Sequence, residues 1–102
     1  MIDLFFRRSQ FTKFCARAEA LFVRKNAEYG DAIATTGLLG AIVEIITVAA
    51  RLKQLIRSPE LILNDFGLRN VIIDKLLDMH NYSNIALMMI EDGNADGENH
   101  GL

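Results

Sequence analysis

Two residue types that often constrain a fold are nearly absent here, because the 102-residue sequence contains one cysteine and one proline. A single cysteine, Cys15, cannot form a disulfide within the chain, which fits the reducing cytoplasm. A single proline, Pro59, and few strand signals leave long segments able to form helices. We therefore expect a cytoplasmic protein of the all-α class.

The charge balance and the apolar runs exclude several classes of function. The formal net charge of -2 provides no basic surface, so we expect no nucleic-acid partner. The longest apolar run, residues 38–50, contains Glu44 and is shorter than the ~20 residues that cross a bilayer. The N-terminal segment also lacks the apolar core of a secretory signal. With 51% hydrophobic residues, the chain predicts one helical domain over residues 1–92 and a disordered polar tail over 93–102.

The first predicted helix begins after Ser9, a good N-cap, and ends near residue 26. One face of this helix is apolar at a period near 3.6, with Phe11, Phe14, Cys15, Ala18, Leu21 and Phe22 as its members. Cys15 has no partner motif, and we interpret it as a packing residue. The polar residues of segment 28–37 break the pattern and predict a loop.

Two further long helices are predicted over residues 38–56 and 68–91, and Gly93 ends the second of them. A short connecting helical turn at residues 61–63 follows the Ser58-Pro59 start signal. Because the connection is short, the two long helices should pair antiparallel, with the first helix packed against them. The predicted fold is thus an antiparallel bundle of three main helices and a short connecting one.

Three main helices cannot cover all the apolar surface of the second and third. The remaining apolar surface predicts a homodimer with a four-helix core, to which each chain contributes two helices. A membrane-binding face is the alternative, but no strongly basic rim accompanies the apolar residues, so we expect no membrane partner.

A polar stripe follows one face of the otherwise apolar third helix. Its members, at helical spacing, are Asn70, Asp74, Asp78 and Asn81. Carboxylates on a buried helix are costly unless they are paired, hydrogen-bonded or bound to a cation. Two acids one turn apart therefore suggest a cation site.

Glu44 is the only acid between Asp31 and Glu60, and it stands among aliphatic residues. If the long helices pair antiparallel, Glu44 can face Asp74 and Asp78. Three carboxylates between helices suit Mg²⁺, with Mn²⁺ as a second possibility. The alternative is a structural ion pair. Glu44 would then pair with Arg51, two turns later on the same helical face, or with a lysine of another chain. His80 lies beside the stripe, and we interpret it as a surface or interface residue.

The segment before the second long helix has residues suited to a nucleotide. Lys25, Tyr29, Gly30 and Asp31 could supply charge, base stacking and close backbone approach. Free backbone N–H groups at the following helix start attract phosphates. The alternative is a simple helix C-cap followed by a turn.

In this order and spacing, these motifs resemble the MazG-like, all-α NTP pyrophosphatase superfamily over residues 22–89. The motifs that carry the resemblance are Lys25-x-x-x-Tyr29-Gly30-Asp31, Gly37-Leu38-Leu39-Gly40, Arg51-Leu52-Lys53 and Asp74-x-x-x-Asp78-x-x-Asn81-Tyr82. The resemblance implies a helical bundle that assembles as a dimer or a dimer of dimers. It also implies Mg²⁺-dependent hydrolysis of a nucleoside triphosphate to the monophosphate and pyrophosphate.

The resemblance implies that Glu44, Asp74 and Asp78 are the metal ligands and catalytic acids. Asn81 and Tyr82 would orient ligands or contact the nucleotide. Phosphate or base contacts would come from Lys25, Tyr29, Asp31, Arg51 and Lys53. Thr47 and Val48 occupy a turn where the family carries further acids, which implies a reduced acidic cluster and a weakened enzyme.

Two hypotheses follow from the sequence. The chain is a Mg²⁺-dependent nucleoside triphosphate pyrophosphohydrolase, or it is a catalytically silent helical dimer or nucleotide-binding module. In the second hypothesis the polar stripe is a buried hydrogen-bond network that fixes how the helices pack.

Overall fold

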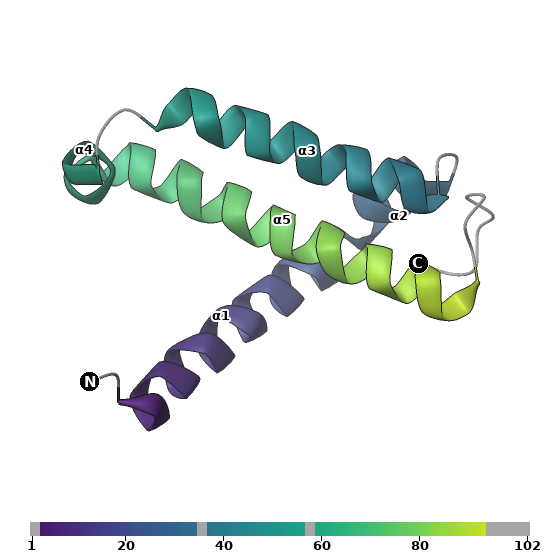
Figure 1. Cartoon of the computed structure of the whole chain (residues 1–102), viewed down its shortest axis with the longest axis horizontal. Coiled ribbons are helices and arrows are strands. Elements are labelled where there is room, and N and C mark those ends of the chain that lie inside the picture. The colour runs from purple at the N-terminus through teal and green to yellow at the C-terminus, as the bar shows by residue number, and fades with distance from the viewer. Residues whose placement is uncertain (1–2, 35–36, 57–58, 94–102) are drawn as a thin grey trace.

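The computed structural model describes residues 3–34, 37–56 and 59–93, and only the backbone of residues 31–34, 59 and 61. Five helices account for nearly all of these residues (Figure 1): α1 (Leu4–Arg24), α2 (Asn26–Ala34), α3 (Gly37–Leu55), α4 (Pro59–Asn64) and α5 (Phe66–Asp92). Within these ranges there is no β-strand. The predicted all-α class is therefore confirmed.

The ends of the longest helix follow from local chemistry. The Asp65 side chain caps α5 by accepting a hydrogen bond from the Leu68 backbone N–H at 3.0 Å. At the other end Gly93 adopts a left-handed conformation with φ of 68°, which glycine does at no steric cost, and its N–H bonds to the Met89 and Ile90 carbonyls. The predicted second and third helices and the stop at Gly93 are confirmed to within two residues.

Two predictions about the N-terminal third are wrong. The first helix begins at Leu4 and not after Ser9, because Asp3 caps it with a 3.2 Å bond from the Phe6 N–H, and the Ser9 hydroxyl donates to the Phe5 carbonyl within the helix. Most of the predicted polar loop is α2, which is separated from α1 by Lys25 alone. The Lys25 N–H bonds to the Leu21 carbonyl, so α1 ends in a tight kink and α2 begins at once.

Helices α3 and α5 run antiparallel along most of their lengths, as predicted, and α4 sits at the end where they are joined (Figure 1). Helix α1 contacts α5 near the middle of α5, and its N-terminal half projects away from the pair. Helix α2 lies at the junction of α1 and α3. The projecting half of α1 is the feature that departs most from a closed bundle.

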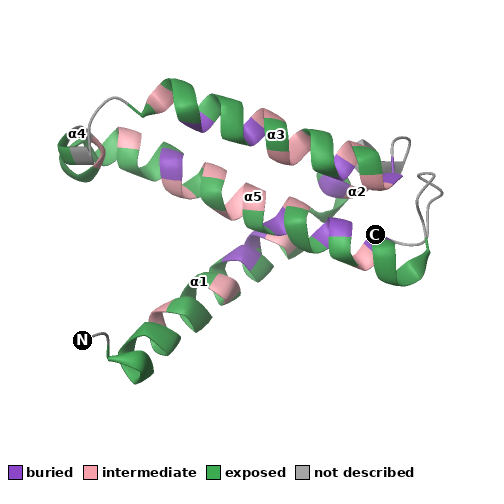
Figure 2. Cartoon of the chain, in the orientation of Figure 1, coloured by how far each residue is buried: buried purple, intermediate pink, exposed green. Residues whose placement is uncertain are grey.

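The core consists of two small clusters along the α3–α5 contact (Figure 2). One is formed by Tyr29, Ala41, Ile85, Ala86 and Met89, and the other by Val48, Leu52 and Ile72. In the described part of the chain, 10 hydrophobic residues are buried, whereas 17 large hydrophobic side chains are exposed. The two long helices were expected to lie in the interior, but only one face of each is buried. No helix among the described residues is long and apolar enough to cross a membrane.

Candidate functional site

A buried hydrogen-bond network links α1, α2 and α5. The Asn81 side-chain amide is 4% exposed, and its Nδ2 donates to the Ala18 carbonyl oxygen at 3.0 Å and to the Tyr29 hydroxyl oxygen at 3.3 Å. The Tyr29 hydroxyl in turn donates to Asp78 Oδ1 at 2.8 Å. Buried polar groups are costly unless they are bonded in this way. The network therefore fixes the position of one carboxylate oxygen of Asp78.

Tyr29 occupies the centre of the network because α2 inserts it between α1 and α5. Its ring is 3% exposed, stacks on Phe22 at a centroid distance of 5.8 Å and meets Tyr82 edge-on at 5.2 Å. Aromatic pairs at these distances add stability beyond their burial. The packing of this ring explains why a segment that reads as a polar loop forms a helix.

The charges of carboxylates from three helices act on the half-buried Tyr82 hydroxyl. Burial raises the pKa of the Tyr82 hydroxyl, and the charges of Glu44, Asp78 and Glu28 raise that pKa further, in this order. Arg51 lowers it in part. These residues come from α2, α3 and α5, so the fold brings together acids that are far apart in the sequence. With three carboxylates and one guanidinium, the formal charge around the ring is negative.

The three predicted metal ligands differ in their surroundings. Glu44 and Asp78 are half-buried, whereas Asp74 is exposed. The polar stripe of α5 runs from exposed Asn70 to buried Asn81, and the bonds from Tyr29 of α2 and to Ala18 of α1 are made at its second half. Among the side chains that the structure describes, no three of His, Cys, Asp or Glu lie close enough together to hold one metal ion.

The predicted substrate contacts are also distributed unevenly. Lys25 is half-buried at the α1–α2 kink, and Arg51 and Lys53 are exposed on α3. Tyr29 and Asn81 are buried, so they act through the network and not from an open surface. The side chain of Asp31 lies outside the described residues, as do Thr35 and Thr36 before α3.

Glu28 is an exposed residue of α2 that received no role in the sequence analysis. It lies on α2 next to Tyr29, and its charge acts on Tyr82 together with those of Glu44 and Asp78. The available signal was its spacing, because Lys25, Glu28 and Tyr29 lie on one helical face. Because we interpreted this segment as a loop, we did not expect these three residues to share a face.

A second polar pair lies on the opposite flank of α5. Cys15 Sγ is 4.0 Å from His80 Nε2, and both side chains line a cavity of about 510 Å³ between α1 and α5. Cys15 is half-buried, as expected of a residue that packs on the apolar face of α1. His80 is exposed, as expected of a surface residue.

Comparisons with known proteins add no relative to this description. No model of a protein family matches the chain, and neither the curated proteins nor the solved structures include a match. The resemblance to the MazG-like superfamily therefore stays a prediction from sequence motifs. The interpretation of the site rests on those motifs and on the geometry given above.

We predict that alkaline pH destabilises the protein through its tyrosines. Burial raises the pKa of Tyr29; the Asn81 hydrogen bond offsets this in part, while Asp78 raises the pKa further, and the pKa of Tyr82 is raised as well. Because the native pKa values exceed the unfolded value near 10, this contribution to stability is complete below pH 10. It decreases above pH 10 by up to ~1.4 kcal/mol per pH unit for each tyrosine.

The measurement is a titration of tyrosinate absorbance, first on the native protein and then in urea. The chain has two tyrosines, so the native curve should show both midpoints above that of the unfolded chain. Tyr82→Phe should halve the pH dependence of unfolding. A native midpoint equal to the unfolded one would contradict the burial described for Tyr29.

Proposed function

We propose that the protein is a Mg²⁺-dependent nucleoside triphosphate pyrophosphohydrolase. The observation that supports this most is the position of Asp78, which accepts a 2.8 Å hydrogen bond from Tyr29 and whose charge, with those of Glu44 and Glu28, raises the pKa of Tyr82. Carboxylate oxygens are the ligands that Mg²⁺ prefers. The MazG-like motifs suggest the reaction, and Glu44 and Asp78 are the half-buried acids that we propose take part in it.

Glu44 and Asp78 are the residues to which we assign the ion. Mg²⁺ is usually held by one or two carboxylates, several waters and the phosphates of the substrate, so a set of three protein ligands is not required. Tyr29 orients Asp78 through its 2.8 Å hydrogen bond. Glu28 adds negative charge beside them. When bound, the ion would polarise the phosphate and lower the pKa of a water.

The basic residues have a separate role in this proposal. Water attacks phosphorus, the bond between the α- and β-phosphates breaks, and pyrophosphate leaves with the electron pair of that bond. Arg51 and Lys53 on α3 and Lys25 at the α1–α2 kink could offset the charge that develops on the phosphates. The cytoplasmic location expected from the single cysteine fits a substrate of this class.

The direct test measures Mg²⁺ response and product together. Mg²⁺ with a nucleoside triphosphate should raise the melting temperature in a concentration-dependent manner, and pyrophosphate should accumulate. Glu28→Gln should lower the rate of release about threefold, since it removes an exposed charge that acts on Tyr82 across the proposed site. Glu91→Gln, at an exposed position near the end of α5, is the matched control and should leave the rate unchanged. Equal rates for both variants would remove Glu28 from the site.

A silent helical module is the second candidate, and the hydrogen-bond network supports it. The chain of bonds from Ala18 through Asn81 and Tyr29 to Asp78 gives each of these three side chains a partner within the protein. Such a network can fix helix packing by itself. Absence of both pyrophosphate release and any Mg²⁺-dependent shift in melting temperature would favour this second function.

A further inference from the structure

The first part of α1 is a projecting helical arm, which we define as residues 3–17. None of these residues is buried, and Ala18 is the first residue of α1 whose side chain packs into the core. The arm points away from the α3–α5 pair, and most of its residues are exposed (Figures 1 and 2). Its surface is therefore available to a partner outside the chain.

The arm is basic, whereas the rest of the chain is acidic. It contains a single acid, Asp3, and four bases, which are Arg7, Arg8, Lys13 and Arg17. The arm therefore has a formal charge of +3, and because the whole chain carries -2, the remaining residues carry -5. The small net charge of the chain conceals this separation. A partner that binds the arm should be anionic.

Aromatic rings are concentrated on the same arm. Four of the six phenylalanines of the chain lie there, namely Phe5, Phe6, Phe11 and Phe14. Phe5 and Phe11 are 81% and 72% exposed. Basic groups lie over two of the other rings, since Arg7 Cζ is 5.6 Å from the centre of the Phe6 ring and Lys13 Nζ is 5.1 Å from that of Phe14. The partner should therefore offer negative charge beside an apolar phase.

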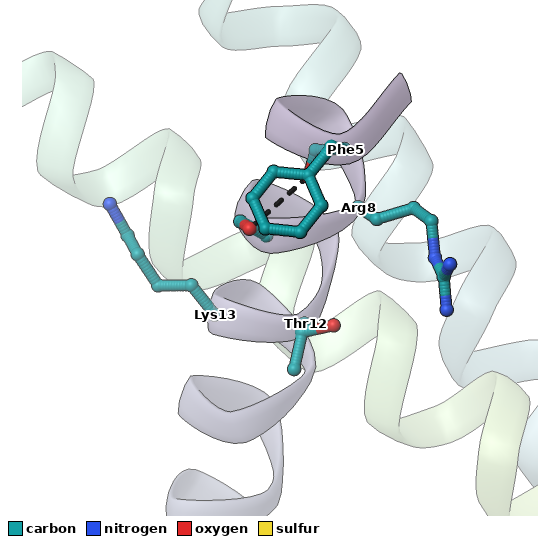
Figure 3. Close-up of a pocket in the computed structure, with 5 residues that line it drawn as sticks. Phe5, Arg8, Thr12 and Lys13 are labelled. Atoms are coloured by element: carbon teal, nitrogen blue, oxygen red, sulfur yellow. Dashed lines mark hydrogen bonds between the residues drawn. The ribbon is translucent and has the colours of Figure 1, made fainter. Parts of the chain in front are cut away.

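The flank of the arm shows how rings and charges are presented together. A hollow of about 540 Å³ is lined by residues of α1 alone, namely Phe5, Arg8, Ser9, Thr12 and Lys13. In Figure 3 the side chains of Arg8 and Lys13 extend to either side of the Phe5 ring. Long basic side chains can reach charged groups in this way while an apolar ring between them enters an apolar phase.

An exposed apolar face on α3 lacks this combination. Its exposed side chains are Leu39, Ile42, Val43 and Ile46. Residues 37–50, which include all four, contain no base and one acid, Glu44. Both α3 and the arm offer apolar area, but only the arm adds positive charge to it. Charge therefore assigns an anionic partner to the arm and not to α3.

We propose that the arm binds the surface of an anionic lipid bilayer. Such a surface attracts clusters of Lys and Arg, and aromatic side chains enter the boundary between its headgroups and acyl chains. The helix lies on this surface and does not span it. Because the arm projects, the acidic remainder of the chain is held away from the anionic lipids. The proposal holds whether or not the chain hydrolyses nucleotides.

The surroundings of the arm favour a bilayer over a nucleic acid. Single-stranded nucleic acids are bound in basic grooves that follow the backbone over several nucleotides. The arm is instead one projecting helix attached to an acidic domain, which would repel an extended polyanion. We expected no membrane partner because the two long helices lack a basic rim. The structure presents the bases and the rings on α1, apart from those two helices.

The test is co-sedimentation with two kinds of vesicle, one of phosphatidylcholine alone and one that also contains phosphatidylserine. The chain should bind only the second kind, and added salt should weaken the binding. The double variant Arg7→Gln, Arg8→Gln should weaken it roughly 25-fold, since each base near an anionic surface contributes about a factor of five. The double variant Arg24→Gln, Arg69→Gln removes two exposed bases outside the arm and should bind as the wild type does. Equal binding to both kinds of vesicle, or equal effects of the two double variants, would overturn the proposal.

A single tryptophan can report which element meets the bilayer, because the chain has none of its own. The emission of Phe5→Trp should move to shorter wavelength when phosphatidylserine vesicles are added, since the ring enters an apolar environment. Phe66→Trp is the matched control, at a 74% exposed position where α5 begins, and its emission should not move. A shift in both variants, or in neither, would reject the arm as the element that binds.

The same variants separate a bilayer from other partners. Circular dichroism should be unchanged in all of them, because the substituted side chains are exposed, so that a loss of binding is not a loss of fold. The Arg7 and Arg8 variant is also tested for binding to a single-stranded oligonucleotide and for self-association without lipid. If the substitutions weaken either of these and leave vesicle binding unchanged, the arm binds a nucleic acid or a second copy, and the proposal fails.

Discussion

Asp78→Asn should lower pyrophosphate release by at least ~100-fold and leave the fold intact. Asparagine keeps an oxygen that can accept the Tyr29 hydrogen bond, which is 2.8 Å long in the native site. It removes the negative charge that would bind the ion and that raises the pKa of Tyr82. The Mg²⁺-dependent rise in melting temperature should disappear together with activity.

Asp74→Asn is the control for this prediction. Asp74 lies one helical turn before Asp78 on the same helix and is exposed, whereas Asp78 is half-buried and bonded to Tyr29. We expect a change of less than about threefold from Asp74→Asn, as for a surface charge removed from a solvated position. Equal losses in both variants would place the ion on the Asp74–Asp78 face. Unchanged activity in Asp78→Asn would remove Asp78 from the metal site.

The two long helices could be predicted because their signals are local. An apolar period near 3.6, the cap at Asp65 and the stop at Gly93 all lie within the helices that they define. The N-terminal third could not be predicted so well. Helix α2 contains Gly30 and several polar residues, and its stability comes from the burial of Tyr29 against Phe22 and against Tyr82, which is distant in the sequence.

The candidate site could be predicted only in part, because helical spacing is a local signal. Spacing made Asp78, Asn81 and Glu44 candidates, since each is polar within an apolar helix. Spacing could not show that Tyr29 of α2 and Ala18 of α1 bond to Asp78 and Asn81, whereas Asp74 stays exposed and the charge of Glu28 acts on Tyr82. Tertiary packing determines which acids lie near one another, and helical periodicity in the sequence does not specify it.

Asn81→Ala should lower the free energy of unfolding by about 2 to 3 kcal/mol. The substitution removes the donors to the Ala18 carbonyl oxygen and the Tyr29 hydroxyl oxygen, at 3.0 Å and 3.3 Å, and leaves a small cavity where three helices meet. The Asn81 amide is 4% exposed, so water cannot readily replace these bonds. Urea unfolding at a fixed chain concentration measures the change.

Asn84→Ala provides the matched control, since it changes the same residue type on the same helix at an exposed position. It should alter stability by less than about 0.5 kcal/mol. Tyr29→Phe should be destabilising as well, because it leaves Asp78 without its hydroxyl donor. The double variant of Asn81 and Tyr29 should lose less than the sum of the two single losses, since both act through one network. Strict additivity would show that the bonds at Asn81 and Tyr29 are energetically independent, so that the network would not couple α1 to the carboxylate of Asp78.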